Sequence, residues 1–285
     1  MEFALSEITL VLFTSLAPSG AVAYAILGLL AIRHKENSAD LRSLSISMGV
    51  PLAVCLVGLI ASATHLGNPA NALYVFSRVG ESPLSNEIAA AVIFFAIAGF
   101  SWLYGFAERL SWQLQRIFLI ISVLLSAIFI MSIAFAYNAD TIVSWSTGFV
   151  PISLVLSGFV GGPLLAFACL RGFCSCCLTE RLRRNLALLS FAGVVFGVAI
   201  LLLQGAAISA LENSTTSIAE LSPHYNLVVL LYAALASLGQ YFVLHAEKTN
   251  ETDARYQIVL GLFLVFCGTF VIRFLFYTTH MTFGL

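Results

Sequence analysis

Long apolar stretches separated by short polar segments dominate this protein. Each stretch is continuous rather than alternating, which favours helices over the strands of a β-barrel. A helix needs about 20 apolar residues to cross the hydrocarbon core of a bilayer. Eight stretches reach that length, at residues 8–32, 44–64, 86–106, 117–137, 149–170, 186–210, 226–244 and 258–277. The pattern therefore predicts an all-α, polytopic membrane helix bundle with eight transmembrane helices.

Composition excludes other classes of protein. Of the 285 residues, 60% are hydrophobic and 9% are charged, whereas soluble globular proteins have about 45–50% and about 25%. A soluble enzyme and a disordered chain are both excluded, and a net charge of −1 gives no reason to bind nucleic acid. We expect one membrane domain over 1–285, with four-helix halves near 1–140 and 141–285. Small residues at Ser157/Gly161 and Gly193/Gly197 have the spacing of close helix packing.

The Lys and Arg residues predict the orientation of the bundle. One set of loops holds eleven of them: Arg33, Lys35, Arg42, Arg109, Arg116, Arg171, Arg181, Arg183, Arg184, Lys248 and Arg255. The opposite set holds only Arg78, and Arg273 falls inside the last span. Cytoplasmic loops are enriched in Lys and Arg. Both termini are therefore predicted to lie outside. An even number of spans agrees with this, because it places the two termini on the same side of the membrane.

Two ionisable residues stand at the predicted outer boundary of the hydrocarbon. His65 ends the second span, and Glu87 opens the third. A histidine at a helix C-terminus, and an acid after a Ser82 or Ser85 N-cap with Pro83 in the first turn, also have ordinary structural explanations. However, an imidazole titrates near neutral pH and can accept a proton from a bound hydroxyl. Both residues are therefore candidates for proton transfer.

The short connection between these two spans carries three further polar candidates. Arg78 is the lone cation of the outer loops, and Asn68 and Asn86 flank it. Because all three come from one connection, they can converge with His65 and Glu87 around a pocket. Pairing of Arg78 with Glu81, with Glu87 or with a partner protein is the alternative explanation.

Metal and haem sites have weaker support. The cytoplasmic segment Cys174-Ser-Cys176-Cys177 lacks the spacing of zinc, iron–sulfur or c-type haem sites, so we expect no metal there. Acylation of these cysteines, or a chance enrichment in cysteine, is the explanation that we expect for this segment. A b-type haem needs two facing histidines, which His65 with His224 or His280 would have to supply.

Three blocks in order, His65-Leu-Gly-Asn-Pro69, Ser77-Arg78-Val-Gly80 and Ser82-Pro-Leu-Ser-Asn-Glu87, resemble the DmsC family. These are anchor subunits of bacterial dimethyl sulfoxide reductase, related to polysulfide and nitrite reductase anchors. The resemblance implies a multi-pass subunit of the bacterial inner membrane, without haem, that oxidises menaquinol. It implies transfer of electrons to a four-cluster iron–sulfur subunit, which feeds a molybdopterin catalytic subunit. The family's quinol-site histidine and glutamate match His65 and Glu87.

The resulting expectation is a quinol site made by His65, Glu87, Arg78, Asn68 and Asn86. Aromatic residues near Tyr74, Phe76 and Trp102 would bury the ring, although an interfacial aromatic belt also explains them. The iron–sulfur partner is expected on the outer face, with the basic face around Arg171–Arg184 as the competing view. A haem-bearing quinol-oxidising anchor of another respiratory complex and, less favoured, a transporter are the alternatives.

The charge distribution yields a direct test of orientation. A reporter that works only outside the cytoplasm should be active when it is fused after Leu285, because the polypeptide crosses the membrane an even number of times from an outer start. Activity of a reporter that works only in the cytoplasm, at the same position, would contradict the predicted orientation.

Overall fold

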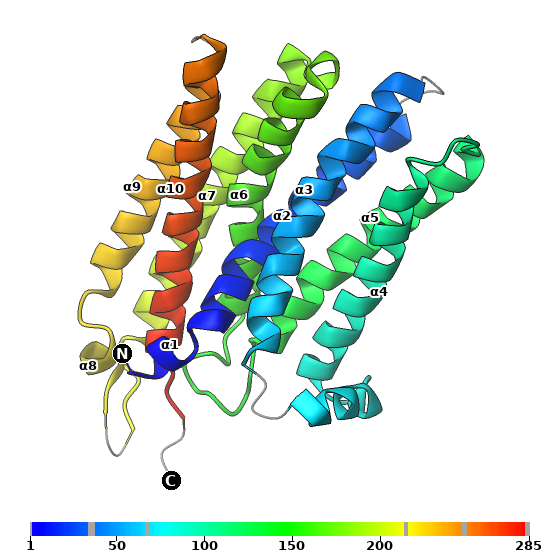
Figure 1. The fold of residues 1–285 in the computed structure, drawn as a ribbon. Coiled ribbons are helices and arrows are strands. Elements are labelled where there is room, and N and C mark those ends of the chain that lie inside the picture. The colour runs from blue at the N-terminus through cyan, green and yellow to red at the C-terminus, as the bar shows by residue number, and fades with distance from the viewer. Residues whose placement is uncertain (1, 34–37, 66–68, 214–215, 247–249, 283–285) are drawn as a thin grey trace.

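The computed structural model describes residues 2–33, 38–65, 69–213, 216–246 and 250–282, and every regular element within them is a helix. Eight of these helices are long and apolar enough to cross a membrane, which confirms the predicted fold class and number of spans. They are α2 (Ile8–Arg33), α3 (Ser38–Ala63), α4 (Pro83–Tyr104), α5 (Trp112–Ala136), α6 (Phe149–Phe173), α7 (Glu180–Ile208), α9 (Tyr225–His245) and α10 (Glu251–Thr278) (Figure 1).

Four short helices lie outside the spans, and the hydrophobic pattern does not predict them. Three of them, α1 (Glu2–Ser6), the 3₁₀ helix η1 (Pro69–Arg78) and α8 (Ile218–Leu221), lie at the end of the bundle that carries both termini (Figure 1). The fourth, the 3₁₀ helix η2 (Ser175–Cys177), joins α6 to α7 at the opposite end. We call these two ends the terminal end and the basic end of the bundle.

Helices α2 and α6 form the centre of the bundle and are mostly buried. Small residues let their backbones approach closely. A methyl group added at Gly158 would lie 2.9 Å from the carbonyl oxygen of Pro18, and one at Gly161 would lie 2.7 Å from Ser19 Oγ. Ser19 Oγ also donates a hydrogen bond to the carbonyl of Ser157 at 3.5 Å. The predicted packing role of Ser157 and Gly161 is therefore confirmed.

A second close crossing joins α9 to α10. A methyl group on Gly239 would lie 2.5 Å from the carbonyl oxygen of Gly261, and one on Gly261 would lie 2.6 Å from that of Gly239. These two glycines are 22 residues apart and belong to no local motif, so their pairing follows from the antiparallel packing of the two helices. The sequence analysis does not predict it.

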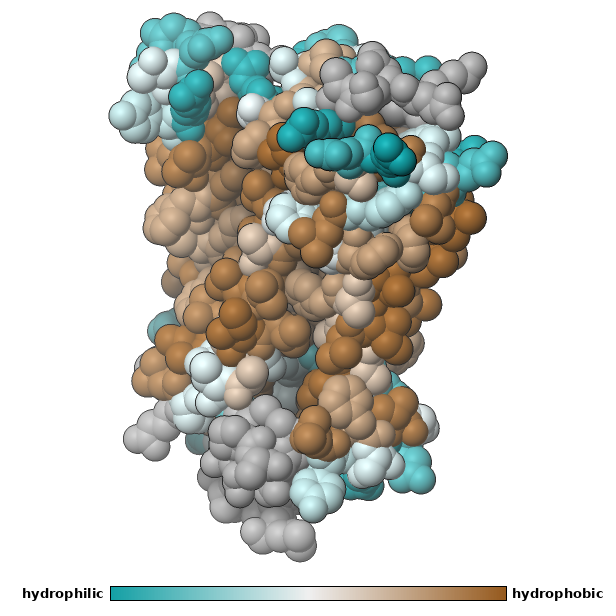
Figure 2. Space-filling model, turned by 45° about the vertical axis from the view of Figure 1, so that its right-hand side comes forward, coloured by the Kyte–Doolittle hydropathy of each residue, from teal (hydrophilic) through white to brown (hydrophobic). Residues whose placement is uncertain are grey.

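The outer surface of the bundle matches a hydrocarbon solvent. Figure 2 shows hydrophobic side chains across the middle of the molecule and hydrophilic ones gathered at the basic end. That end carries the described arginines of the first loop set, which are Arg33, Arg42, Arg109, Arg116, Arg171, Arg181, Arg183, Arg184 and Arg255. Positive residues favour the cytoplasmic side. The assignment of the basic end to the cytoplasm stays a prediction, as does the division into halves at 1–140 and 141–285.

The glycine pair generates a stability prediction. Gly239→Leu should lower the free energy of unfolding by about 1–3 kcal/mol or more, because the added side chain forces α9 and α10 apart. Gly99→Ala, at a position where a methyl group meets nothing within 4 Å, is the matched control and should leave stability unchanged or slightly raised. Thermal unfolding in detergent measures both. Equal unfolding temperatures for the two variants would contradict the assigned packing.

Candidate functional site

His65 lies just beyond the last residue of α3 and contacts an acidic residue from the start of the sequence. Its Nε2 atom is 3.2 Å from Glu7 Oε2, and Glu7 lies between α1 and α2. The imidazole is exposed, whereas the Glu7 carboxylate is largely covered. The sequence analysis did not single out Glu7 as a site residue. The sequence does contain a signal for Glu7. This acidic residue directly precedes the first apolar span and therefore lies at the same predicted membrane boundary as His65.

Glu87 points into the bundle rather than toward solvent. The helix α4 begins at Pro83 after an N-cap at Ser82, and Glu87 follows in its second turn with 4% of its surface exposed. Within the described residues, its Oε2 atom has no hydrogen-bond partner. An ionisable group buried at the edge of the hydrocarbon is a functional candidate by default. Its burial argues against a role limited to the N-terminus of the helix.

Two buried tyrosines lie within reach of the charge of this carboxylate, and neither is evident as a site residue from the sequence. Tyr137 directly follows α5 and Tyr277 lies in the last turn of α10; their ring centroids are 6.1 Å apart. The charge of Glu87 reaches both tyrosines, and that of Glu7 reaches Tyr137. The Tyr277 side chain interacts with those of Tyr137 and Thr14. We call this group the neighbourhood of Glu87. It consists of Glu7, Glu87, Tyr137 and Tyr277, and His65 lies at its rim.

Aromatic rings close this neighbourhood at the terminal end. Trp145 lies 5.6 Å from Tyr277 between ring centroids, and its indole Nε1 donates to the carbonyl of Phe276. His280 stacks on Phe3 at 3.9 Å. Partial burial lowers the pKa of His280. These contacts tie α1 and the connection before α6 to the end of α10.

The other three predicted site residues lie at the surface or outside the described part of the structure. The Asn86 side chain is exposed and accepts a hydrogen bond from the backbone N–H of Gly80 at 2.6 Å, which holds the turn between η1 and α4. Arg78 is exposed, and among the described residues it pairs with neither Glu81 nor Glu87. Asn68 lies outside the described residues.

The expected aromatic wall around the ring is only partly supported. Tyr74 and Phe76 are exposed on η1. Trp102 packs against Gly49 near the basic end of α4. It is 15 residues from Glu87 on one helix, or roughly 22 Å at 1.5 Å per residue. Placing Trp102 at this site is therefore wrong, because Trp102 and Glu87 lie at opposite ends of one membrane-spanning helix.

Several surface grooves are large enough for a ring or an isoprenoid tail, and two of them are the largest of these. One, of about 570 Å³, lies between α4 and α5 beside the neighbourhood of Glu87, and is lined by Pro83, Asn86, Ala127, Ile128, Met131, Ser132 and Phe135. The other, of about 620 Å³, lies at the basic end and includes Arg42, Glu108 and Trp112. Ligand sites commonly have volumes of about 300–1,000 Å³. The first of these two is lined by Asn86, the residue directly before Glu87.

A buried cation lies one helical turn from Tyr277. Arg273 is 2% exposed, its Nη2 is 3.5 Å from Ser153 Oγ, and it forms no ion pair within the described residues. It borders an enclosed cavity of about 10 Å³ together with Gln204 and Tyr225, which is room for about one water molecule. The fields of Arg273 and Glu87 both reach Tyr277.

Eight apolar helices, with hydrophobic side chains over the outer surface, define a multi-pass membrane protein. The model of the DMSO reductase anchor subunit family, DmsC, matches residues 1–279. The protein belongs to this family and is therefore the membrane anchor of a dimethyl sulfoxide reductase complex.

Three relatives agree with this assignment. The sequence is 31% identical over 286 residues to the YnfH subunit of an anaerobic dimethyl sulfoxide reductase of Escherichia coli K12, covering 98% of this sequence and 96% of the relative. It is 31% identical over 230 residues to the C subunit of anaerobic dimethyl sulfoxide reductase from the same organism, covering 80% and 79%. It is 28% identical over 289 residues to the C subunit of the Haemophilus influenzae enzyme, covering 100% and 99%.

Proposed function

We propose that this protein oxidises menaquinol at the terminal end of the bundle and passes the electrons to an iron–sulfur subunit. The observation that carries the proposal is the Glu87 carboxylate, which is buried among apolar surroundings beside Tyr137 and Tyr277, without a hydrogen-bond partner for its Oε2 atom in the described residues. Such a group in the interior is retained only where it serves a purpose. A hydroxyl-bearing ring entering from the bilayer would supply the missing partner.

Each quinol releases two electrons and two protons, so the site needs two proton acceptors. His65 takes one proton from a quinol hydroxyl as general base, and the nearby Glu7 carboxylate stabilises the resulting imidazolium. Glu87 takes the second proton or holds the other end of the ring. Because the His65 side chain is exposed, its proton passes directly to water at the terminal end.

The remaining surroundings suit a quinol with an isoprenoid tail. The groove between α4 and α5 offers an apolar channel for the tail, and Asn86 and Ser132 are its polar members. Tyr137 and Tyr277 offer hydroxyls and ring faces in the interior. Arg273 provides a positive charge beyond Tyr277, which favours the loss of protons from the ring. Arg78 acts at the rim, where a partner protein completes the pocket, and Asn68, which lies outside the described residues, is proposed to bind the quinol as well.

The partner is proposed to bind the terminal end. Electron transfer requires a cluster close to the quinol, and this sequence has no motif for an internal redox group. The helix η1 presents Leu73, Tyr74 and Phe76 to the surroundings, with 78%, 72% and 42% of their surfaces exposed. Apolar and aromatic side chains with few charges are typical of the core of an interface. A four-cluster iron–sulfur subunit covering η1 would pass electrons to a molybdopterin catalytic subunit.

The proposed setting is the bacterial inner membrane, with the terminal end outside. His65 contacts Glu7, and His280 stacks on Phe3. Neither contact resembles the facing pair of imidazoles that holds a haem, which favours the quinol site over the haem-bearing alternative. Among the described residues, Arg273 is the one cation deep in a span. That is too little to favour a transporter.

His65→Ala should slow the quinol-dependent reduction of the terminal acceptor by about 10²-fold or more, because a general base contributes at least that factor to the rate. Glu87→Gln keeps the shape of the side chain and should impair the same reaction. The assay compares reduction driven by a menaquinol analogue with reduction driven by a soluble dye that feeds the catalytic subunit directly.

His245→Ala is the matched control, since His245 stacks on Tyr241 at the basic end of α9. Dye-driven activity should be equal in all variants, which shows that the complex assembles. An assembled His65→Ala complex that oxidises quinol at the unchanged rate would overturn the proposed role of His65.

A further inference from the structure

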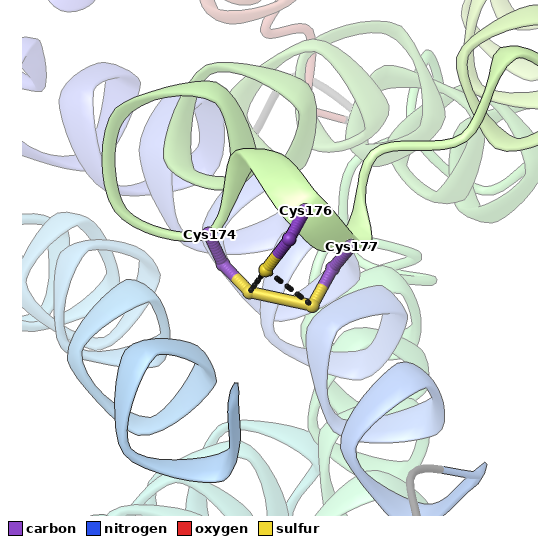
Figure 3. A group of neighbouring side chains, drawn as sticks. All are labelled: Cys174, Cys176 and Cys177. Carbon is purple, nitrogen blue, oxygen red and sulfur yellow. Dashed lines mark hydrogen bonds between the residues drawn. A yellow bond between two sulfur atoms is a disulfide. The ribbon is translucent and has the colours of Figure 1, made fainter. Parts of the chain in front are cut away.

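Three cysteines gather in the connection between α6 and α7, at the end of the bundle opposite the proposed quinol site. Cys174 follows α6, and Cys176 and Cys177 belong to η2. Figure 3 shows their sulfur atoms pointing toward one another, with a disulfide between Cys174 and Cys177. The Cys176 sulfur lies 3.6 Å from that of Cys174 and 3.9 Å from that of Cys177.

A fourth potential ligand reaches this cluster from a distant part of the sequence. Asp40 Oδ1 in the first turn of α3 lies 3.4 Å from Cys176 Sγ, although the two residues are 136 positions apart. Cys174 and Cys177 are buried, and Cys176 is exposed. The cluster is therefore covered on the protein side and open on one side, where an ion can enter.

The distances from the Cys176 sulfur match a tetrahedral zinc site, whereas the sulfurs of Cys174 and Cys177 are joined as a disulfide and must separate before both can bind. With Zn–S near 2.3 Å and Zn–O near 2.0 Å, a tetrahedron places sulfur atoms about 3.8 Å apart and a sulfur about 3.5 Å from an oxygen. The two distances from the Cys176 sulfur to the other sulfurs and its distance to Asp40 lie close to these values. Three thiolates with one carboxylate also form a donor set that zinc accepts.

The charges around the cluster favour such a site. Three thiolates and a carboxylate around a divalent ion carry a net charge of −2. Cys177 lines one groove together with Arg33 and Arg181, so two cations lie beside the cluster.

We propose that Cys174, Cys176 and Cys177 in their reduced state, together with Asp40, bind one zinc ion. Starting from the disulfide, two molecules of a small cytosolic thiol give up their hydrogens to the two cysteine sulfurs and leave as their own disulfide. Zinc then binds, and the three cysteine thiols release three protons. The bound ion fastens the α6–α7 connection to the start of α3 at the basic end of the bundle.

This proposal revises the expectation that the cysteines hold no metal. That expectation followed from the spacing Cys-Ser-Cys-Cys, which lacks the second pair of ligands found in zinc ribbons. The structure supplies a further ligand from α3, where local sequence spacing does not reveal it.

Cobalt binding to the purified full-length protein tests the site. Under an inert atmosphere with a phosphine reductant, Co²⁺ should give a thiolate-to-cobalt charge-transfer absorption with one equivalent per molecule, and Zn²⁺ should displace it. Cys176→Ser should lower the affinity for Co²⁺ by at least about tenfold. Loss of a residue that only hydrogen-bonds to a metal ligand already has an effect of that size. Asp40→Asn should lower the affinity as well. Cys267→Ser, a half-buried cysteine of α10, is the matched control.

Three results would overturn the proposal. One is the absence of a charge-transfer band in the reduced protein, and another is equal binding by Cys176→Ser and Cys267→Ser. The third is a Cys174–Cys177 disulfide that remains intact after rapid alkylation of anaerobically grown cells, because two of the ligands would then be occupied.

Discussion

Hydrocarbon cannot accept or donate a hydrogen bond, and this constraint governs both the fold and the site. Each backbone group within the membrane must find its partner inside its own helix. Polar side chains must find partners inside the protein, and most of them do. Ser190 donates to the carbonyl of Val160 and accepts from Gln240, which links α6, α7 and α9. Against this background, a buried Glu87 carboxylate oxygen without a described partner is conspicuous.

The same constraint separates two kinds of chemistry at the two ends of the bundle. The terminal end holds the pair of His65 and Glu7, the buried Glu87 and the two tyrosines. These are groups that exchange protons or hydrogen bonds. The basic end holds the arginines and the cysteine cluster. In our account the first end performs the redox chemistry and receives the partner, while the second fixes the orientation and stabilises a connection between helices.

The sequence was sufficient for the features that depend on local composition. Eight apolar stretches are enough to specify eight helices, because length and hydropathy decide whether a helix spans the membrane. His65 and Glu87 could be selected because each stands directly at the predicted outer end of an apolar stretch and because both match the DmsC motif. Ser157 and Gly161 could be assigned to packing because their spacing places them on one helix face.

Features that depend on how helices rotate against one another could not be read from one sequence. The contact of Glu7 with His65, the pairing of Gly239 with Gly261 and the approach of Asp40 to Cys176 each join residues from different helices or connections. Tyr137 and Tyr277 resemble ordinary interfacial tyrosines until the bundle brings them together.

The central claim is that quinol binds at the terminal end. A photoreactive menaquinone analogue, cross-linked in the assembled complex and mapped by mass spectrometry, tests it most directly. We predict labelled peptides from the start of α4 and the ends of α5 and α10, around Glu87, Tyr137 and Tyr277, with labelling suppressed by excess menaquinone. Labelling confined to the groove at the basic end, around Arg42, Glu108 and Trp112, would contradict the account.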